Sequence, residues 1–404
     1  MNRQEFIKSG LTLGLGMPFL SLLLNSCSKE DELQLNDQDF ITDFSGKVII
    51  IGAGAAGLSA GYLLNRYGVD FQIIEASDSY GGRVKRDDSL ADFSIDLGAE
   101  WIHDEPSVLA EILNDPSLDA DIGFIKYNPQ SYNLWHNGKL NKMNFARNFY
   151  SEYKFKKTSW YGFFEKYMVP HIEDRILLNC PVKKVEQANG QVNVEIMDGS
   201  QYRADKVLVT VPIKILQSDI IQFNPPLSDQ KRNAINSIQM GAGLKAFIEF
   251  EEKFYADITL EGKLFDAINA DDKIYYDAAF RKDSDENILG LFTINEKAER
   301  FTSLDSEEEI IALIISDLDE MYEGQASKYY KRHVIQNWSK EPYIMGSYSY
   351  DFDGSQSAMV ETILEPVNNM IYFAGEALSL DSQATVHGAC YSGMEVTGNM
   401  IQTF

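Results

Sequence analysis

Basic residues, cysteines and histidines are scarce in this chain of 404 residues, and each scarcity excludes a class of protein. Lysines and arginines number 36 against 61 aspartates and glutamates, which gives a net charge of −25. Because a nucleic-acid-binding surface needs basic residues to neutralise phosphates, we expect no nucleic-acid partner. The 3 cysteines form no C-x-x-C pair, and the 5 histidines are dispersed without the spacing of metal ligands. We therefore expect neither a disulfide framework nor a metal site.

The apolar stretch near the N-terminus, Leu11 to Leu24, is too short for a transmembrane helix, which needs about 20 apolar residues. Glycines and a proline also interrupt it, and Arg3 and Lys8 give a positive charge to the residues before it. This pattern is typical of an export signal rather than of a membrane span.

Residues 24–27, Leu-Asn-Ser-Cys, resemble a lipoprotein processing site, at which Cys27 becomes the lipidated first residue. We therefore predict a lipoprotein-type signal peptide over residues 1–27 and a flexible linker over the polar, acidic residues 28–45. The mature protein would be exported and lipid-anchored at the bacterial cell envelope, on the periplasmic side or at the outer-membrane surface. Residues 3–8 resemble a twin-arginine signal with Gln4 in place of the second arginine, so the Sec and twin-arginine export routes both remain open.

Residues 47–83 contain the pattern of a dinucleotide-binding site. Val48 to Ile51 form a short apolar run suited to a buried parallel strand, and Gly52, Gly54 and Gly57 follow as a G-x-G-x-x-G turn. The first glycine allows a tight turn, the second lets a pyrophosphate approach the backbone, and the third lets the next helix pack closely on the strand. The N-terminus of that helix presents unpaired N–H groups and the positive end of its dipole to the phosphates.

The same segment continues with a helix and a second strand. We predict the helix over Leu58 to Tyr67, with Gly68 as its stop, and the strand over Val69 to Ile74. Glu75 then lies 18 residues beyond Gly57, near the spacing of about 20 at which a carboxylate accepts hydrogen bonds from a ribose diol. Together these features indicate a dinucleotide site rather than an ordinary glycine-rich turn.

Two further patterns lie outside this segment. Val192 to Ile196 and Ala204 to Val211, joined by a turn at Asp198 and Gly199, predict a hairpin that leads back into the core. Apolar residues at helical spacing predict an amphipathic helix over Ser306 to Tyr322, which we interpret as scaffold.

After Glu75, the residues Ala76 to Asp78 lead into Gly81-Gly82-Arg83. This run resembles the segment of flavin amine oxidases, the family of monoamine oxidases, polyamine oxidases and histone lysine demethylases, in which the arginine of the turn contacts the FAD pyrophosphate. Later segments match in the family's order: Asp96 to His103, Cys180 to Val182, Ala204 to Pro212, Tyr372 to Glu376, Ala384 to Ala389 and Ser392-Gly393. The segments Gly346 to Tyr350 and Ala384 to Ala389 are most similar to the polyamine oxidase and lysine demethylase branch.

This resemblance implies an α/β fold, with a Rossmann-like FAD-binding domain that is discontinuous in sequence and an α+β substrate domain. We place the FAD-binding domain at residues 46–101, 176–243 and 365–404, and the substrate-binding domain at residues 102–175 and 244–364. The residues that the resemblance and the dinucleotide pattern assign to the FAD site are Gly52, Gly54, Ala56, Gly57, Glu75, Ala76, Gly82, Arg83, Gly98, Ala99, Glu100, Trp101, Val182, Gly375, Glu376, Thr385 and Val386.

Four residues are candidates for chemistry. Lys245 lies in an apolar strand, where a charged side chain needs a partner, and the matching family lysine holds a water beside flavin N5 that assists the reaction with oxygen. Tyr348 resembles one wall of the family's amine slot, and Thr385 replaces the aromatic residue of the opposite wall in monoamine oxidases. Trp338 falls on a family position near the flavin. Ser347 stands where monoamine oxidases have a flavin-binding cysteine, so we expect non-covalent FAD.

The resemblance implies oxidation of a C–N bond of an amine, either a polyamine or a monoamine, to an imine, with oxygen as acceptor and hydrogen peroxide as product. Two alternatives remain open. One is an L-amino acid oxidase or flavin desaturase of the same fold; an amino acid oxidase should offer an arginine to the substrate carboxylate. The other is a flavin-binding lipoprotein without activity, because the region from Pro106 to Pro170 is short beside the helical substrate domain of family members.

Overall fold

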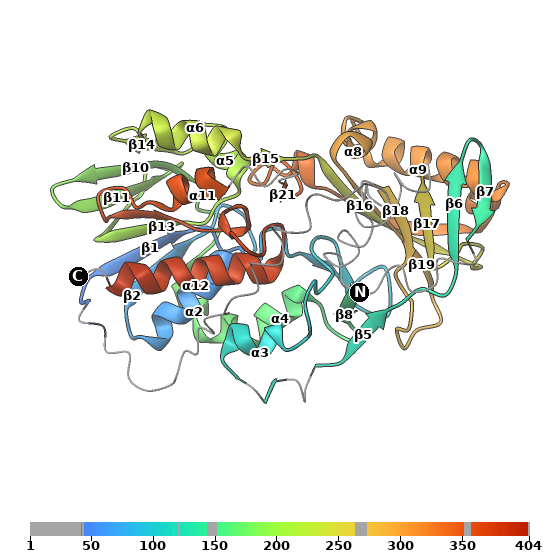
Figure 1. Cartoon of the computed structure of the whole chain (residues 1–404), viewed down its shortest axis with the longest axis horizontal. Coiled ribbons are helices and arrows are strands. Elements are labelled where there is room, and N and C mark those ends of the chain that lie inside the picture. The colour runs from blue at the N-terminus through green and yellow to red at the C-terminus, as the bar shows by residue number, and fades with distance from the viewer. Residues whose placement is uncertain are drawn as a thin grey trace, which may run out of the picture.

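The computed structural model describes residues 42, 44–115, 117–118, 122–143, 152–262, 273–350 and 357–402. The predicted signal peptide with Cys27, and most of the predicted linker, lie outside the described residues. Within these ranges no helix is long and apolar enough to cross a lipid bilayer. Figure 1 shows two halves side by side, and each half is built on one large sheet.

The first half is built on five parallel strands. In spatial order they are β22 (Ile371–Phe373), β13 (Lys206–Val209), β1 (Lys47–Ile51), β2 (Asp70–Ile74) and β9 (Ile176–Leu177). Segments far apart in the sequence therefore form one sheet. The boundaries of the two domains stay a prediction.

The central strand β1 is buried on both faces. On one face, Val48 and Ile50 share a hydrophobic cluster with the helices α2 (Ala55–Arg66) and α12 (Val386–Gln402), which Figure 1 shows lying along the sheet. On the other face, Ile49 and Ile51 belong to a second cluster with the side chains of a four-stranded sheet. A strand covered on both faces requires a continuous apolar run, which is why the sequence predicted this strand correctly.

The four-stranded sheet has the order β12 (Gln201–Ala204), β11 (Gln191–Ile196), β10 (Val182–Ala188) and β14 (Gln222–Asn224). The predicted hairpin is correct at its first strand and wrong at its second. Residues Gln201–Ala204 pair with β11, whereas Lys206–Val209 form β13 of the parallel sheet. All four residues of β13 are buried because it lies between β1 and β22, so this apolar run marks a central strand and not a hairpin arm.

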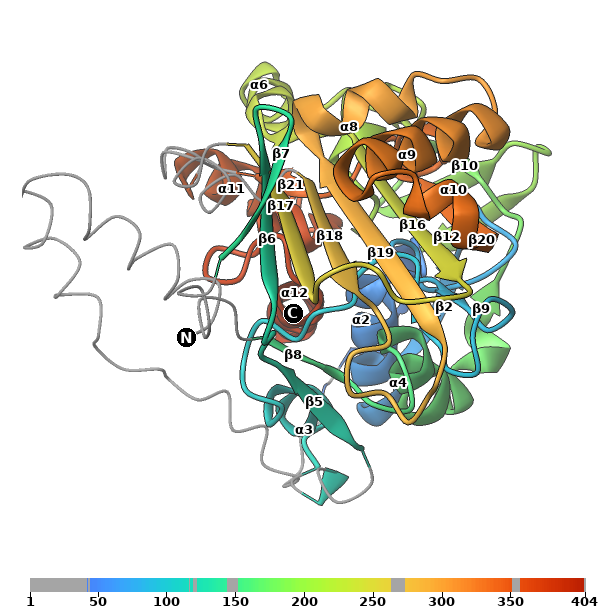
Figure 2. The same ribbon diagram turned by 90° about the vertical axis from the view of Figure 1, so that its right-hand side faces the viewer.

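The second half is built on seven strands. Their order is β20 (Tyr330–Asn337), β16 (Gly243–Phe250), β19 (Asn287–Ile294), β18 (Lys273–Asp277), β17 (Ile258–Glu261), β6 (Tyr132–His136) and β7 (Lys139–Lys142). On one face α9 (Glu307–Tyr322) packs Ile314 in a cluster with Leu244 of β16. Figure 2 shows α9 and α10 (Gln325–Tyr329) lying across β16 and β20. The predicted helix is thus confirmed, with Ser306 as its N-cap.

Short strand pairs and helices complete the described fold. The pairs are β3 (Arg86–Asp87) with β4 (Ile95–Asp96), β5 (Phe124–Tyr127) with β8 (Glu152–Phe155), and β15 (Gln239–Met240) with β21 (Ser349–Tyr350). The remaining α-helices are α3 (Val108–Leu113), α4 (Trp160–Tyr167), α5 (Ile213–Gln217), α6 (Asp229–Ser237), α8 (Asn295–Thr302) and α11 (Ser357–Leu364). Short 3-10 helices are labelled η: η2 (Val169–His171), η3 (Glu173–Arg175), η4 (Trp338–Lys340) and η5 (Glu376–Leu378).

Helix α2 begins at Ala55, earlier than the predicted start at Leu58, so the third glycine of the phosphate turn lies inside its first turn.

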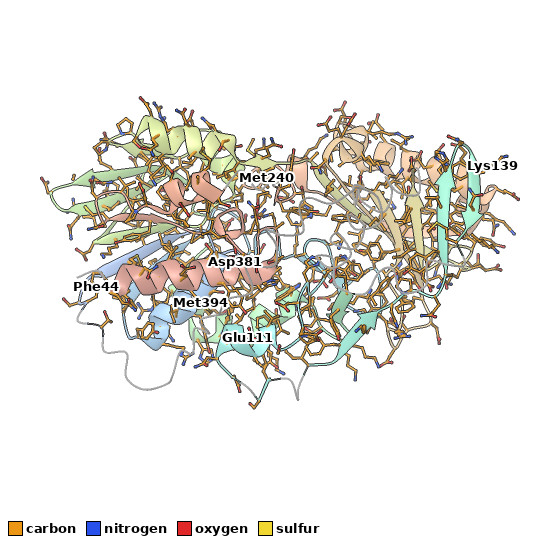
Figure 3. All side chains as sticks on the ribbon, in the orientation of Figure 1. Phe44, Glu111, Lys139, Met240, Asp381 and Met394 are labelled. Atoms are coloured by element: carbon orange, nitrogen blue, oxygen red, sulfur yellow. The ribbon has the colours of Figure 1, made fainter. Side chains whose placement is uncertain are left out.

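In Figure 3, Met394 on α12 lies in the first half, whereas Lys139, at the start of β7, lies at the outer end of the second half.

Candidate active site

One cavity of about 260 Å³ is lined by residues of both the five-stranded and the seven-stranded sheet. The four residues proposed for chemistry, Lys245, Trp338, Tyr348 and Thr385, all line it. So does every residue predicted for the FAD site except Gly57. The structure therefore brings residues from the whole length of the described chain to a single site.

The phosphate turn has the backbone that its glycines predict. Gly52 adopts a φ of +107°, a conformation that side chains rarely allow. A Cβ at Gly57 would lie 2.0 Å from the carbonyl oxygen of Gly52, so only glycine lets α2 approach β1 this closely. At Gly54, by contrast, the nearest described atom to a Cβ is the carbonyl oxygen of Gly81 at 3.9 Å, an ordinary van der Waals distance, so this position is not crowded. Gly54 and Ala55 line the cavity at the N-terminus of α2, a place that suits a phosphate group.

Glu75 follows β2 and binds the backbone of the phosphate turn. Its carboxylate is buried and accepts hydrogen bonds from the backbone N–H of Ala53 at 2.6 Å and of Ser77 at 2.8 Å. Each oxygen keeps a further lone pair, and Glu75 lines the cavity. The carboxylate is therefore held in place to accept hydrogen bonds from a ribose diol.

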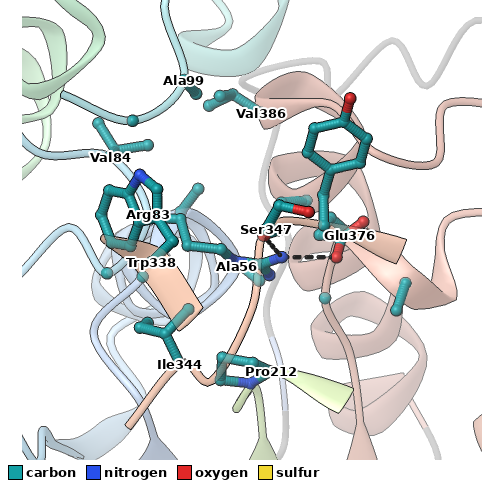
Figure 4. A pocket seen from close by; sticks show the side chains of 18 of the residues that line it. Ala56, Arg83, Val84, Ala99, Pro212, Trp338, Ile344, Ser347, Glu376 and Val386 are labelled. Atoms are coloured by element: carbon teal, nitrogen blue, oxygen red, sulfur yellow. Dashed lines mark hydrogen bonds and ion pairs between the residues drawn. The ribbon is translucent and has the colours of Figure 1, made fainter. Parts of the chain in front are cut away.

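Arg83 and Glu376 connect three segments at the cavity wall (Figure 4). The Nη1 atom of Arg83 lies 2.7 Å from the Glu376 carboxylate and donates to the carbonyl oxygen of Ser347 at 3.0 Å. Glu376 also accepts hydrogen bonds from the Ser349 backbone and hydroxyl and from the N–H of Ala384. Both of these contacts of the guanidinium use Nη1, so they leave its Nε and Nη2 N–H groups for a phosphate.

Lys245 projects from β16 into a buried ionic cluster. Its ammonium donates to the carbonyl oxygens of Asp96 at 2.7 Å and Gly98 at 3.1 Å, and to the Glu100 carboxylate at 2.8 Å. These three bonds match the three donors of an ammonium group. A lysine in an apolar strand thus has the partners that its burial demands.

Glu100 is shared by a second lysine and a tyrosine. Lys154 of β8 lies 3.4 Å from the carboxylate, and the hydroxyl of Tyr276 also donates to it. Burial alone would raise the pKa of Glu100, but Lys245 and Lys154 outweigh it and lower the pKa to about 2. The carboxylate is therefore ionised and neutralised within the protein.

Lys154 lies among aromatic rings. Its ammonium is 5.5 Å from the ring centre of Trp101 and 5.0 Å from that of Tyr127, and it donates to the carbonyl oxygen of Ala278 at 3.0 Å. Burial lowers the pKa of this lysine, while Glu100 opposes the shift. The sequence prediction missed Lys154 and Tyr276. Lys154 stands between Tyr153 and Phe155, so the signal that drew attention to Lys245 was present here too.

The other predicted site residues have structural roles as well. The indole N–H of Trp338 donates to the carbonyl oxygen of Leu97 at 3.0 Å, which fixes its ring against Gly98. The hydroxyl of Thr385 accepts from the N–H of Gly388 at 2.9 Å and caps the N-terminus of α12. Tyr348 lines the cavity next to Ser347. Among the residues described, no group of three or more side chains could hold a metal ion.

These elements define a dinucleotide-binding oxidoreductase fold, and comparison with known proteins agrees. The chain matches the family described as "Flavin containing amine oxidoreductase" over residues 55–158 and 164–401. Because the match covers more than half of the chain, the chain belongs to this family. The predicted α/β fold, with its Rossmann-like and α+β parts, is confirmed.

Individual relatives are distant. Lysine-specific histone demethylase 2 of Homo sapiens is 26% identical over 439 residues, covering 87% of this chain and 53% of the relative. Probable polyamine oxidase 4 of Arabidopsis thaliana is 24% identical over 436 residues, covering 87% of this chain and 86% of the relative. The structure of cyclohexylamine oxidase from Brevibacterium oxydans IH-35A has a TM-score of 0.73 at 14% identity, covering 89% of this chain and 99% of that chain. The chain spans about half the length of the first curated relatives it matches.

FAD is the cofactor that this family membership assigns, and the residues present fit it. The cavity at the N-terminus of α2 suits the pyrophosphate, and the fixed carboxylate of Glu75 suits the adenosine ribose. The cavity continues past Gly98 and Trp101 to the sheet face that carries Lys245.

Proposed function

We propose that the chain is an FAD-dependent amine oxidase that converts a C–N bond of an amine to an imine, with dioxygen as acceptor and hydrogen peroxide as product. The observation that carries this proposal is one cavity lined both by the dinucleotide-binding turn and by Lys245 of the seven-stranded sheet. Names of similar proteins include a polyamine oxidase and a cyclohexylamine oxidase, which supports an amine as substrate.

Bound FAD would supply the acceptor for the hydride equivalent that leaves the α-carbon of the amine. The chain would hold it through the N-terminus of α2, Glu75 and Arg83. Ser347 offers a hydroxyl and not a thiol, which supports non-covalent binding. Trp338 and Tyr348 would form walls that place the amine and exclude water, so orientation is the chief contribution of the protein.

Lys245 would orient the water that assists reaction with oxygen. All three of its donors have protein partners in this structure, so such a water would replace one of them. The contact with Gly98 is the longest of the three, at 3.1 Å, and is therefore the one that exchanges at least cost.

An amino acid oxidase is less well supported. Such an enzyme should offer an arginine to the substrate carboxylate, and in the described cavity lining the arginine is Arg83, whose Nη1 is bound to Glu376 and Ser347. A flavin-binding protein without activity would need no Lys245 at the end of the cavity.

The test is release of hydrogen peroxide by purified, FAD-loaded protein on addition of monoamines, diamines, polyamines and amino acids in turn. Oxidation of at least one amine, with no turnover of amino acids, is expected. Turnover of amino acids alone would assign the amino acid oxidase alternative. Retention of FAD with no peroxide and no reduction of FAD by any compound would assign the inactive flavin-binding alternative.

We also propose export and lipid anchoring at Cys27, which the sequence alone supports. In bacteria that express the full chain, the wild-type protein should incorporate labelled palmitate and sediment with membranes. Cys27→Ser should lose both properties. Equal labelling of the variant and the wild type would contradict the anchor.

A further inference from the structure

One face of the seven-stranded sheet forms the wall of the cavity opposite the dinucleotide turn. Strand register places Lys245, Phe292 and Ile274 side by side in one row. The adjacent row contains Gly290, Tyr276 and Ile258. Apart from Gly290, these residues line the cavity, so this wall is apolar except for the Lys245 ammonium and the Tyr276 hydroxyl.

Both of those polar groups point to the same partner. Lys245 and Tyr276 each donate to the Glu100 carboxylate. A Cβ at Gly290 would lie 2.6 Å from the Tyr276 ring, so the glycine leaves the space in which this ring lies. The wall therefore presents hydrocarbon surface to the cavity, while its polar atoms are used within the protein.

The carboxylates that line the described cavity are Glu75, Glu100 and Glu376, and each is engaged. Glu75 lies at the dinucleotide turn and accepts two backbone N–H groups. Glu376 is paired with Arg83. Glu100 has two lysines against its single charge, so the cluster around it does not attract a further cation.

We propose that this cavity selects amines whose carbon chain is apolar and carries no second ammonium group. The proposal rests on the proposed amine oxidase function and names its substrate class. An alkyl or aryl chain gains free energy by covering the wall of Phe292, Ile274 and Ile258. A second ammonium would have to lose its water there, and the carboxylates of the described lining are already engaged.

Among the described residues of the cavity, the pair of His103 and Glu152 is a place where a second ammonium could find a partner. His103 lines the cavity, and its Nδ1 lies 3.4 Å from the Glu152 carboxylate, which is buried behind it. Recognition of diamines at this pair is the competing account, and Glu152→Gln separates the two.

The experiment compares hexylamine with 1,6-diaminohexane on FAD-loaded protein at one pH. The two compounds have the same chain and differ in one terminal ammonium. We expect kcat/KM for hexylamine to exceed that for the diamine by at least about tenfold. Binding is measured separately, without turnover, from the change in the flavin absorption spectrum on adding amines that lack an α-hydrogen, again with and without a second ammonium.

Two variants sharpen the comparison. Ile274→Asp places a carboxylate on the wall and should shift the ratio of kcat/KM toward the diamine by about tenfold. Glu152→Gln should leave the ratio unchanged. The wild-type comparison decides the question even where a variant fails to hold FAD.

The outcomes are distinguishable. Equal or better oxidation of the diamine overturns the substrate class while the amine oxidase function stands, and loss of that diamine activity in Glu152→Gln would assign its recognition to the His103 pair. If no amine changes the flavin spectrum and no amine is oxidised, the proposed amine oxidase function itself is wrong, and the proposed substrate class is wrong with it.

Discussion

The ammonium of Lys245 and the carboxylate of Glu100 form an ion pair of 2.8 Å that is buried between the seven-stranded sheet and the segment following β4. The two residues are far apart in sequence and come from the two halves of the molecule. The pair therefore connects the half that carries the dinucleotide-binding turn to the wall of the cavity on the seven-stranded sheet, and several measurements can test what it does.

Replacing Lys245 tests its role with oxygen. In Lys245→Met, reoxidation of reduced flavin by oxygen should slow by at least about tenfold, because a fixed charged donor is removed from the site. The amount of FAD bound should not change. Lys139→Met, at the outer end of the second half, is the matched control. Stopped-flow traces that coincide for the wild type and Lys245→Met would remove the lysine from this role.

Replacing Glu100 tests the cluster. Glu100→Gln leaves two buried ammonium groups without their counter-charge, so we expect a loss of about 3–5 kcal/mol in the free energy of unfolding. The double variant Glu100→Gln/Lys154→Met should lose less than the sum of the single variants, because it removes charge of both signs. Denaturant unfolding of the four proteins measures this, and additive losses would contradict a coupled cluster.

Asp96 predicts a dependence of stability on pH. Burial, with the charge of Glu100 nearby, raises the pKa of Asp96 to about 8, whereas the unfolded chain titrates near 4. The folded protein keeps this proton where the unfolded chain has lost it. The stability from this group is therefore fully present below about pH 4 and is lost as the pH rises toward 8. Asp96→Asn should flatten that part of the stability profile; an unchanged slope would show that Asp96 ionises normally.

Glu75 should decide the affinity for FAD. Glu75→Gln keeps the shape of the side chain but removes the charge that accepts the ribose hydrogen bonds, and the lost charged bonds are worth about 1.5–3 kcal/mol. We expect the dissociation constant of FAD to rise by about 10- to 150-fold. Titration of the apoprotein by flavin fluorescence measures it. Ser79→Ala, whose hydroxyl contacts the exposed Asp78, is the control, and equal affinities of both variants would argue against the role of Glu75.

The dinucleotide-binding turn could be predicted from the sequence because its determinants are local. The strand, the glycines, the helix, the second strand and Glu75 follow one another within one short segment. The need for glycine at Gly52 and Gly57 is set by the backbone of the same segment. The cap formed by Thr385 is also local, because its hydroxyl accepts from the N–H of Gly388, three residues further along the chain.

The ionic cluster could not be predicted in the same way. Lys154, Tyr276 and Glu100 come from three distant segments, and their contact depends on how the two sheets approach each other. The second arm of the hairpin was wrong for a related reason. An apolar run such as Lys206–Val209 fits a hairpin and a central parallel strand equally well until its neighbours are known.

The central claim is that this cavity holds non-covalent FAD beside an amine, and anaerobic titration tests it most directly. Purified protein should be yellow, should bleach on addition of an amine without oxygen, and should release intact FAD into the supernatant on acid precipitation. A protein that stays colourless after incubation with FAD, or flavin that stays on the precipitated chain, would contradict this account.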